Sequence, residues 1–159
     1  TTYFKAEDAE NVENLIKPNT KVLYLETPTN PAIEVLDLEF FGKIAKKHHL
    51  IFIVDNCFAT PYLQQPIKFG ADLVVHSATK LIDGQGRVLG GVTVGRADLI
   101  KEIYAFSRLT GPSLAPLARP PEDRRRPAPL PGLKAVLLRS SIPGPGAAPR
   151  SGSDAGTRP

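Results

Sequence analysis

The chain has 159 residues, 42% of them hydrophobic, which is enough apolar material for one domain with a buried core. Its single cysteine, Cys57, excludes an internal disulfide framework, and no apolar run is long enough to cross a membrane. The net charge of +4 is uneven: residues 117–159 hold eight of the 20 Lys and Arg and three of the 16 Asp and Glu, so this stretch carries +5 and the rest carries −1.

The first part of the chain predicts a helix, a strand and a second helix. Residues 8–17 carry apolar side chains on one face and stop at Pro18, as a short helix does. Residues 21–26 predict a strand, and residues 27–31 a loop whose two prolines restrict its shape. Residues 37–48 predict a helix that Asp37 can cap.

The second part predicts three further strands and their connections. Residues 50–54 are five apolar residues and predict a fully buried strand. A short helix near residues 62–69 and another buried strand at 73–75 follow. Residues 91–95 predict a strand and residues 96–107 a helix. Strands that alternate with helices through short links predict an α/β fold with a largely parallel sheet and flanking helices.

Three polar residues follow three of the predicted strands. Asn30, Asp55 and Lys80 each come shortly after a strand. The carboxyl ends of parallel strands meet at one edge of a sheet, where α/β proteins bind ligands, so these three side chains could line one crevice.

The residue types at this edge predict a particular chemistry. Lys80, in a partly desolvated crevice, would lose proton affinity and act as an amine nucleophile or base. Ser77 and Thr79 beside it are neutral hydrogen-bond donors suited to a phosphate. Asp55 follows a buried strand, where a carboxylate is costly unless a cation faces it. No spacing of His, Cys, Asp and Glu suggests a metal site.

Three ordered motifs carry a resemblance to a known family. They are Glu-Thr-Pro-Thr-Asn-Pro at 26–31, Val-Asp-Asn-Cys-Phe-Ala-Thr-Pro-Tyr at 54–62 and Ala-Asp-Leu-Val-Val-His-Ser-Ala-Thr-Lys at 71–80. Together they resemble the Cys/Met-metabolism family of pyridoxal-phosphate (PLP) enzymes, over residues from about Tyr3 to about Pro116. The run at 80–91 is most similar to the branch of the family that joins sulfide to O-succinylhomoserine.

The resemblance implies a cofactor and a role for each candidate residue. Residues 1–116 would be part of the large PLP-binding domain of a fold-type I, aspartate-aminotransferase-like enzyme. Lys80 would bind the PLP aldehyde and move protons at Cα and Cβ of the substrate, and Asp55 would face the pyridinium nitrogen. Ser77 and Thr79 would contact the phosphate, and Asn30 would lie near the cofactor hydroxyl and the substrate carboxylate.

The activity that the resemblance implies is a γ-replacement in sulfur amino-acid biosynthesis, by trans-sulfuration. Related family activities are the alternatives: cystathionine γ-synthase, methionine γ-lyase or cystathionine lyase. The partner would be a small amino-acid substrate, with a homo-oligomer in the full-length parent and no membrane. The single cysteine and the absence of a signal-peptide pattern favour a cytoplasmic location.

The chain resembles only the middle third of such enzymes and begins with Thr1, so we expect a fragment of a longer protein with little or no activity of its own.

Residues 117–159 hold nine of the 16 prolines and five of the 13 glycines, which predicts disorder. Only residues 135–138 there could form a turn of helix or a short strand. We expect this tail to be an out-of-frame translation. A non-catalytic remnant that associates with intact relatives is another reading, as is a nucleic-acid binder that uses the basic tail, although specific recognition is not expected.

Overall fold

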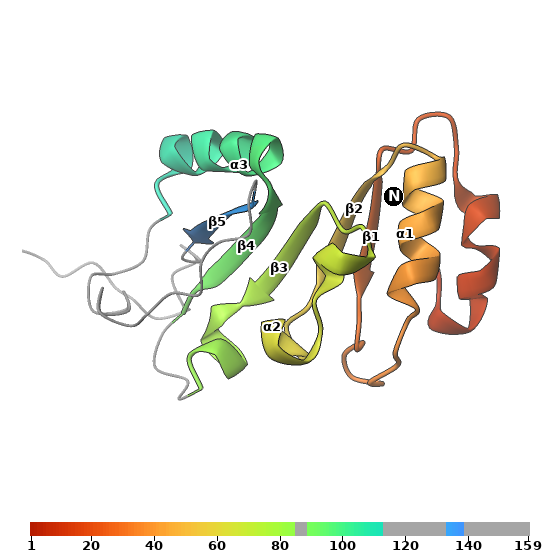
Figure 1. Cartoon of the computed structure of the whole chain (residues 1–159), viewed down its shortest axis with the longest axis horizontal. Helices are drawn as coiled ribbons and strands as arrows, with labels where there is room; N and C mark the ends of the chain where they lie inside the picture. Colours follow the sequence, from red (N-terminus) through yellow and green to blue (C-terminus); the bar gives the residue numbers. More distant parts are fainter. Residues whose placement is uncertain (85–88, 113–132, 139–159) are drawn as a thin grey trace, which may run out of the picture.

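The structure is a computed structural model that describes residues 1–84, 89–112 and, for the backbone alone, 133–138. These residues form one sheet whose strands lie side by side in chain order. Figure 1 shows the sheet running from β1 on the right to β5 on the left. The strands are β1 (Val22–Glu26), β2 (Ile51–Asp55), β3 (Leu73–Ser77), β4 (Gly91–Arg96) and β5 (Leu133–Leu138).

The sheet is mixed. β1, β2 and β3 are parallel to one another, whereas β4 is antiparallel to β3 and β5 is antiparallel to β4. The first three strands therefore follow the expected α/β pattern, and the α/β class with flanking helices is confirmed. The link from β3 to β4 contains no full crossover helix among the described residues, so the chain turns back and pairs in the opposite direction.

The helical segments agree with the sequence pattern to within a few residues. The first is a 3₁₀ helix, η1 (Ala6–Leu15), and the second is α1 (Leu38–Lys47). The short helix expected near 62–69 is two pieces, α2 (Thr60–Leu63) and η2 (Pro66–Phe69). A π-helical turn, η3 (Ala78–Ile82), follows β3, and α3 (Ala97–Thr110) follows β4. None of the helices described could span a membrane.

Helix α1 begins at its expected cap and covers one face of the sheet. The Asp37 side chain accepts hydrogen bonds from the backbone N–H of Glu39 (2.9 Å) and Phe40 (3.1 Å). This satisfies two donors that the first turn of a helix leaves unpaired. The core under α1 and η1 consists of Val12, Leu23, Leu25, Leu38, Phe41, Ile44, Ala45, Leu50, Phe52, Val54, Ala71 and Val74.

The other face of the sheet has a smaller core under α3. Leu73 packs against Ile100 of α3, whereas its neighbour Val74 belongs to the core under α1, because successive strand residues face opposite sides. On the α3 side of β1, Val22 and Tyr24 are about half exposed, at 46% and 52%. The described residues therefore cover the α1 face of the sheet more completely than the α3 face.

Most of the C-terminal stretch lies outside the described residues. The predictions of disorder and of an altered reading frame fall on residues 117–132 and 139–159, about which the structure says nothing. Strand β5 includes residues 135–138, the run that the sequence singled out as able to form a strand.

Candidate functional site

The loops that follow β1, β2 and β3 meet at one edge of the sheet, the lower edge in Figure 1. The register aligns the strand ends there: Glu26 pairs with Asp55, and Asp55 pairs with Val75. Asn30 follows β1, Asp55 is the last residue of β2 and Lys80 lies in the turn after β3, so all three lie at the same edge of the sheet.

Asp55 is half-buried, and donors contact both of its carboxylate oxygens. The backbone N–H of Cys57 donates to Oδ1 (3.1 Å), and the Tyr24 hydroxyl on β1 donates to Oδ2 (3.4 Å). Burial, and after it the neighbouring Asp55 charge, together raise the pKa of Tyr24 to about 12. The carboxylate is thus oriented by its neighbours, and Tyr24 stays protonated as a donor at neutral pH. The sequence motifs did not single out Tyr24.

Lys80 lies in the η3 turn, close to the loop after Asp55. Its Nζ is 5.9 Å from the centroid of the Phe58 ring, so the amine lies near the segment that carries Asp55. The side chain is exposed, in contrast to the partly desolvated crevice expected from the sequence. Within the described residues its amine contacts the Phe58 ring, and one ring leaves the rest of the side chain open to water.

Ser77 and Thr79 are held differently from each other. The Thr79 hydroxyl donates to the Gly90 carbonyl (3.2 Å) and accepts from the Gly90 N–H (2.9 Å), so its only proton is already in use. The Ser77 hydroxyl makes no hydrogen bond within the described residues. Ser77 is therefore the better placed of the two predicted phosphate contacts. Asn30 is exposed on its loop.

A buried polar network behind this edge ties the loops together. Asn56 is fully buried; its Nδ2 donates to the carbonyls of Thr60 (3.1 Å) and Gln64 (2.9 Å). Gln64 Nε2 in turn donates to Asn56 Oδ1 and to the Thr27 carbonyl in the loop after β1, both at 2.8 Å. Asn56 belongs to the motif at 54–62, but only the fold shows that it connects the loops.

His76 and Cys57 are structural neighbours of the site. His76 is 3% exposed and its Nδ1 donates to the Asn56 carbonyl (3.1 Å); burial lowers its pKa, so the ring is neutral at pH 7. Burial, and after it the contact with Asp55, together raise the pKa of Cys57 to about 11. Both findings agree with the interpretation of His76 as a packed, hydrogen-bonded residue and of Cys57 as a loop residue. No cluster of His, Cys, Asp and Glu that could hold a metal lies in the described part of the chain.

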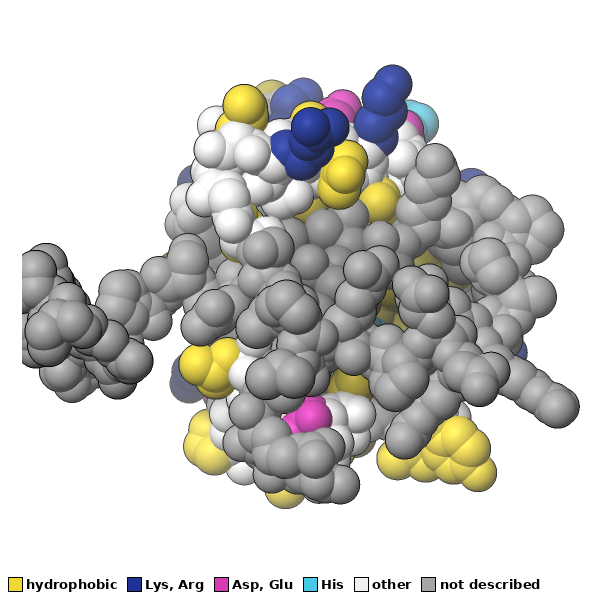
Figure 2. Space-filling view, turned by 90° about the vertical axis from the view of Figure 1, so that its left-hand side faces the viewer, with side chains coloured by type: hydrophobic (Ala, Val, Ile, Leu, Met, Phe, Trp, Pro, Cys, Tyr) yellow, Lys and Arg dark blue, Asp and Glu magenta, His cyan; other side chains and the backbone are white. Residues whose placement is uncertain are grey.

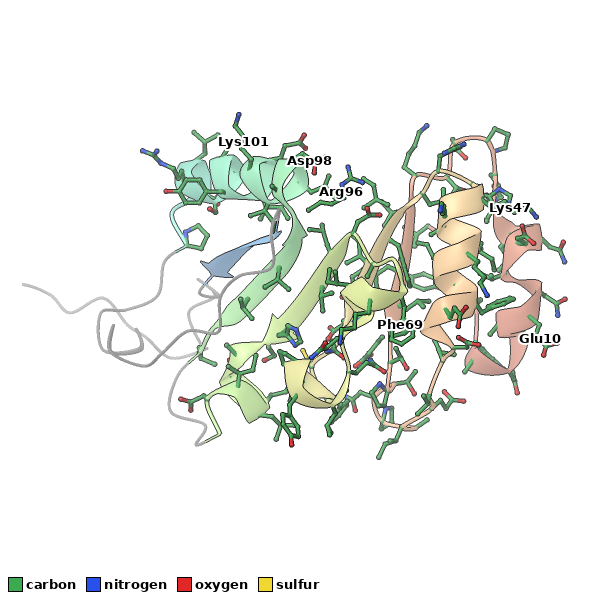
Figure 3. All side chains as sticks on the ribbon, viewed as in Figure 1. Glu10, Lys47, Phe69, Arg96, Asp98 and Lys101 are labelled. Carbon is green, nitrogen blue, oxygen red and sulfur yellow. The ribbon has the colours of Figure 1, made fainter. Side chains whose placement is uncertain are left out.

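A groove of about 820 Å³ lies at the opposite edge of the sheet, between α1, η2 and the start of β3. Figure 3 shows Arg96 beside Asp98 near this upper edge. Arg96 is tied to Asp72 and Asp98 by ion pairs of 2.7 and 2.6 Å. None of the five predicted site residues lines this groove, so the candidate site rests on the chemistry of the loops at the lower edge.

The chain was compared with known proteins. The model of the Cys/Met metabolism PLP-dependent enzyme family matches residues 1–119. The chain belongs to this family. Residues 1–119 contain all three motifs that carry the resemblance, and the family depends on PLP.

Similar proteins in the family have different activities. O-succinylhomoserine sulfhydrylase of Pseudomonas aeruginosa is 52% identical over 104 residues, which cover 65% of this chain and 26% of the relative. Cystathionine gamma-lyase of Bacillus subtilis is 45% identical over 117 residues, 73% of this chain and 31% of the relative. The crystal structure of cystathionine gamma-lyase from Lactobacillus plantarum, complexed with L-serine, matches with a TM-score of 0.69 and 40% identity, over 74% of this chain and 31% of that one. The chain thus spans less than a third of the length of these relatives.

The residues at the lower edge fit PLP by their chemistry. An amine on Lys80, a carboxylate on Asp55 and a hydroxyl on Ser77 match the aldehyde, the pyridinium nitrogen and the phosphate. The loop after β2 contacts both charged groups: the Cys57 N–H donates to the Asp55 carboxylate, and the Lys80 Nζ lies over the Phe58 ring. This edge therefore carries an amine, a carboxylate and a hydroxyl.

Proposed function

We propose that this chain forms part of a PLP-dependent enzyme that replaces the γ-substituent of an amino acid, with O-succinylhomoserine and sulfide as substrates and homocysteine as product. The observation that carries the proposal is the 52% identity to O-succinylhomoserine sulfhydrylase over 104 residues. The substrate is a small amino acid, and the full-length parent acts as a homo-oligomer.

Each candidate residue has a role that its position supports. Bound PLP supplies an electron-withdrawing ring that stabilises negative charge at the substrate Cα. Asp55 holds the proton on the ring nitrogen by its negative charge, and its two donors fix the direction of the carboxylate. Lys80 would hold the aldehyde end of PLP with its amine, and the same amine would hold or move a proton at Cα and Cβ of the substrate. Ser77 donates to the phosphate, with Thr79 in support, and Asn30 orients the substrate carboxylate.

A second activity in the same family has specific support. L-methionine gamma-lyase of Fusobacterium nucleatum is 46% identical over 118 residues, which is close to the value for the sulfhydrylase. Assays of the longer protein that contains this chain would separate them. Production of homocysteine from O-succinylhomoserine and sulfide supports the sulfhydrylase, whereas elimination from methionine or cystathionine supports a lyase.

The chain alone is expected to bind PLP weakly and to turn over little substrate. It covers 26% of the sulfhydrylase, so we expect the described residues to supply only part of the hydrogen bonds that a cofactor phosphate needs. Each charge-assisted bond that is missing removes about 1.5–3 kcal/mol of binding free energy.

The first test is covalent trapping on this chain. PLP is added, the protein is reduced with borohydride, and the modified lysines are located by mass spectrometry of peptides. We expect labelling of Lys80 at PLP concentrations that leave the exposed Lys68 unmodified, and Asp55→Asn should weaken labelling of Lys80 alone. Equal labelling of Lys80 and Lys68 that Asp55→Asn leaves unchanged would overturn the assignment of the site.

A further inference from the structure

Cys57 contacts both halves of the candidate site. Its backbone N–H donates to Asp55 Oδ1 (3.1 Å), and its Sγ accepts the backbone N–H of Ser77 (2.7 Å), which is 20 residues further along the chain. Ser77 is the last residue of β3 and leads directly into the turn that carries Lys80. One residue therefore joins the carboxylate end of the site to the amine end, through its backbone N–H toward Asp55 and its half-buried side chain toward Ser77.

The sulfur extends the contact between β2 and β3 beyond the end of their ladder. The last register pair of these strands is Asp55 with Val75, and the Asn56 N–H donates to the Val75 carbonyl. The Asn56 carbonyl accepts a hydrogen bond from His76 Nδ1, while the Ser77 N–H donates to Cys57 Sγ. The Cys57 side chain thus continues the contact between β2 and β3 at Ser77, just before the turn that carries Lys80.

The protonation state of Cys57 suits a contact rather than a reaction. Its pKa is raised to about 11, first by burial and then by Asp55, so the group is a neutral thiol at pH 7. A neutral thiol adds no second negative charge beside Asp55. It also lacks the thiolate character that a nucleophilic cysteine needs, although the Lys80 charge and the Ser77 N–H act in that direction.

We propose that Cys57 is a positioning residue that holds Asp55 and the segment 77–80 in a fixed relation, so that both ends of PLP meet their partners together. This inference rests on the proposed function, because it assigns the two ends of the cofactor to Asp55 and Lys80. A cofactor ring is rigid, and its binding groups must be held to within about 0.5 Å of the productive geometry by the residues behind them. Cys57 is the residue of the described chain that contacts both segments directly through hydrogen bonds.

The test compares replacements of Cys57 that differ in one property. Cys57→Ser keeps a hydrogen-bond acceptor, whereas Cys57→Val fills a similar volume without one. Tyr62→Ala is the matched control, because Tyr62 belongs to the same loop but its side chain is 90% exposed. For each protein we would measure the PLP dissociation constant by absorbance titration, the borohydride-trapped fraction at Lys80 and the circular dichroism of bound PLP.

We expect Cys57→Val to raise the PLP dissociation constant about five- to thirty-fold, the effect of leaving the Ser77 N–H without its acceptor, and to reduce the circular dichroism of the bound ring. Cys57→Ser should keep the PLP dissociation constant and the circular dichroism of bound PLP close to those of the unmodified chain. Tyr62→Ala should leave both quantities unchanged. Far-ultraviolet circular dichroism without PLP checks that each variant is folded. If Cys57→Val does not fold, Cys57→Ala takes its place in the comparison with Cys57→Ser.

Two results would overturn the inference, and they are distinguishable. If the unmodified chain traps PLP at Lys80 and the variant without an acceptor binds PLP as well as Cys57→Ser does, Cys57 has no positioning role and the proposed function stands. If the unmodified chain traps no PLP at Lys80, the proposed function fails and this inference fails with it.

Discussion

The buried amide of Asn56 provides a quantitative test of how the loops at the lower edge are held. Replacing Asn56 by alanine removes three hydrogen bonds: two that Nδ2 donates to the carbonyls of Thr60 and Gln64, and one that Oδ1 accepts from Gln64. Because Asn56 is 0% exposed, the groups that it hydrogen-bonds would lose these bonds at a buried position.

The expected loss follows from the number of bonds. A typical intramolecular hydrogen bond contributes a net ~0.5–1.5 kcal/mol to the free energy of unfolding, and a buried group left without a partner costs more than this average. Gln64 is half-buried, so water can satisfy part of what it loses. We therefore expect Asn56→Ala to reduce the free energy of unfolding by about 2–4 kcal/mol.

The assay is urea denaturation followed by circular dichroism at fixed pH, with PLP omitted. At a slope of about 2 kcal/mol per molar urea, the midpoint should fall by about 1–2 M while the slope stays unchanged. Gln65→Ala is the matched control, because Gln65 is exposed and its side chain makes one hydrogen bond, to the Pro61 carbonyl (3.2 Å). The control should change the free energy by less than about 0.5 kcal/mol.

A loss below about 1 kcal/mol for Asn56→Ala, or a loss equal to that of Gln65→Ala, would refute this reasoning. Either result would mean that the loops after β1 and β2 are held by their backbone alone. The network that runs from Asn56 through Gln64 to Thr27 would then have no measurable energetic role.

Two further predictions concern packing and pH. A Cβ on Gly42 of α1 would lie too close to the backbone carbonyl oxygen of Phe69. Gly42→Ala should therefore lower the free energy of unfolding by a net ~1–2 kcal/mol, even though alanine favours helices, whereas Lys43→Ala, at an exposed site in the same helix, should not lower it. Equal urea midpoints for the two variants would contradict the close approach of Gly42 to Phe69. Because burial lowers the pKa of His76 below its usual 6.5, the unfolded chain binds a proton more readily, so the stability due to His76 should be complete above pH 6.5 and decline as the pH falls below it. Urea midpoints at pH 7.5 and 5.5 should show a steeper decline for the unmodified chain than for His76→Gln, and identical declines would contradict the assignment of a buried neutral ring.

Several apolar side chains around the lower edge are exposed. Leu63 of α2 and Leu81 of η3 are 76% and 60% exposed, and Leu89 beyond η3 is 58% exposed. Figure 2 shows apolar side chains at the lower margin of the face it presents, below the cationic groups of its upper margin. Apolar side chains exposed in this way are sites where a protein can bury further surface.

Local patterns in the sequence were enough to locate most of the helices and strands. The apolar run at 50–54 became β2, and the helix capped by Asp37 became α1, each within one residue of its expected start. The same patterns placed Asn30, Asp55 and Lys80 at one edge, because parallel strands align their carboxyl ends. The motifs around these residues also led to the family, because their order and spacing are specific to it.

Other features depend on contacts between residues far apart in the chain. The antiparallel return of β4, the exposure of Lys80 and the bond from Gln64 to Thr27, 37 residues away, have no local sequence signal. The same holds for the contact of Cys57 with Ser77. The amino-acid sequence alone determined which residues form strands and helices and which chemistry they carry, because those properties depend on neighbours along the chain. Only the tertiary structure decided which polar groups are buried and which partners they meet, because burial and pairing depend on how distant segments pack.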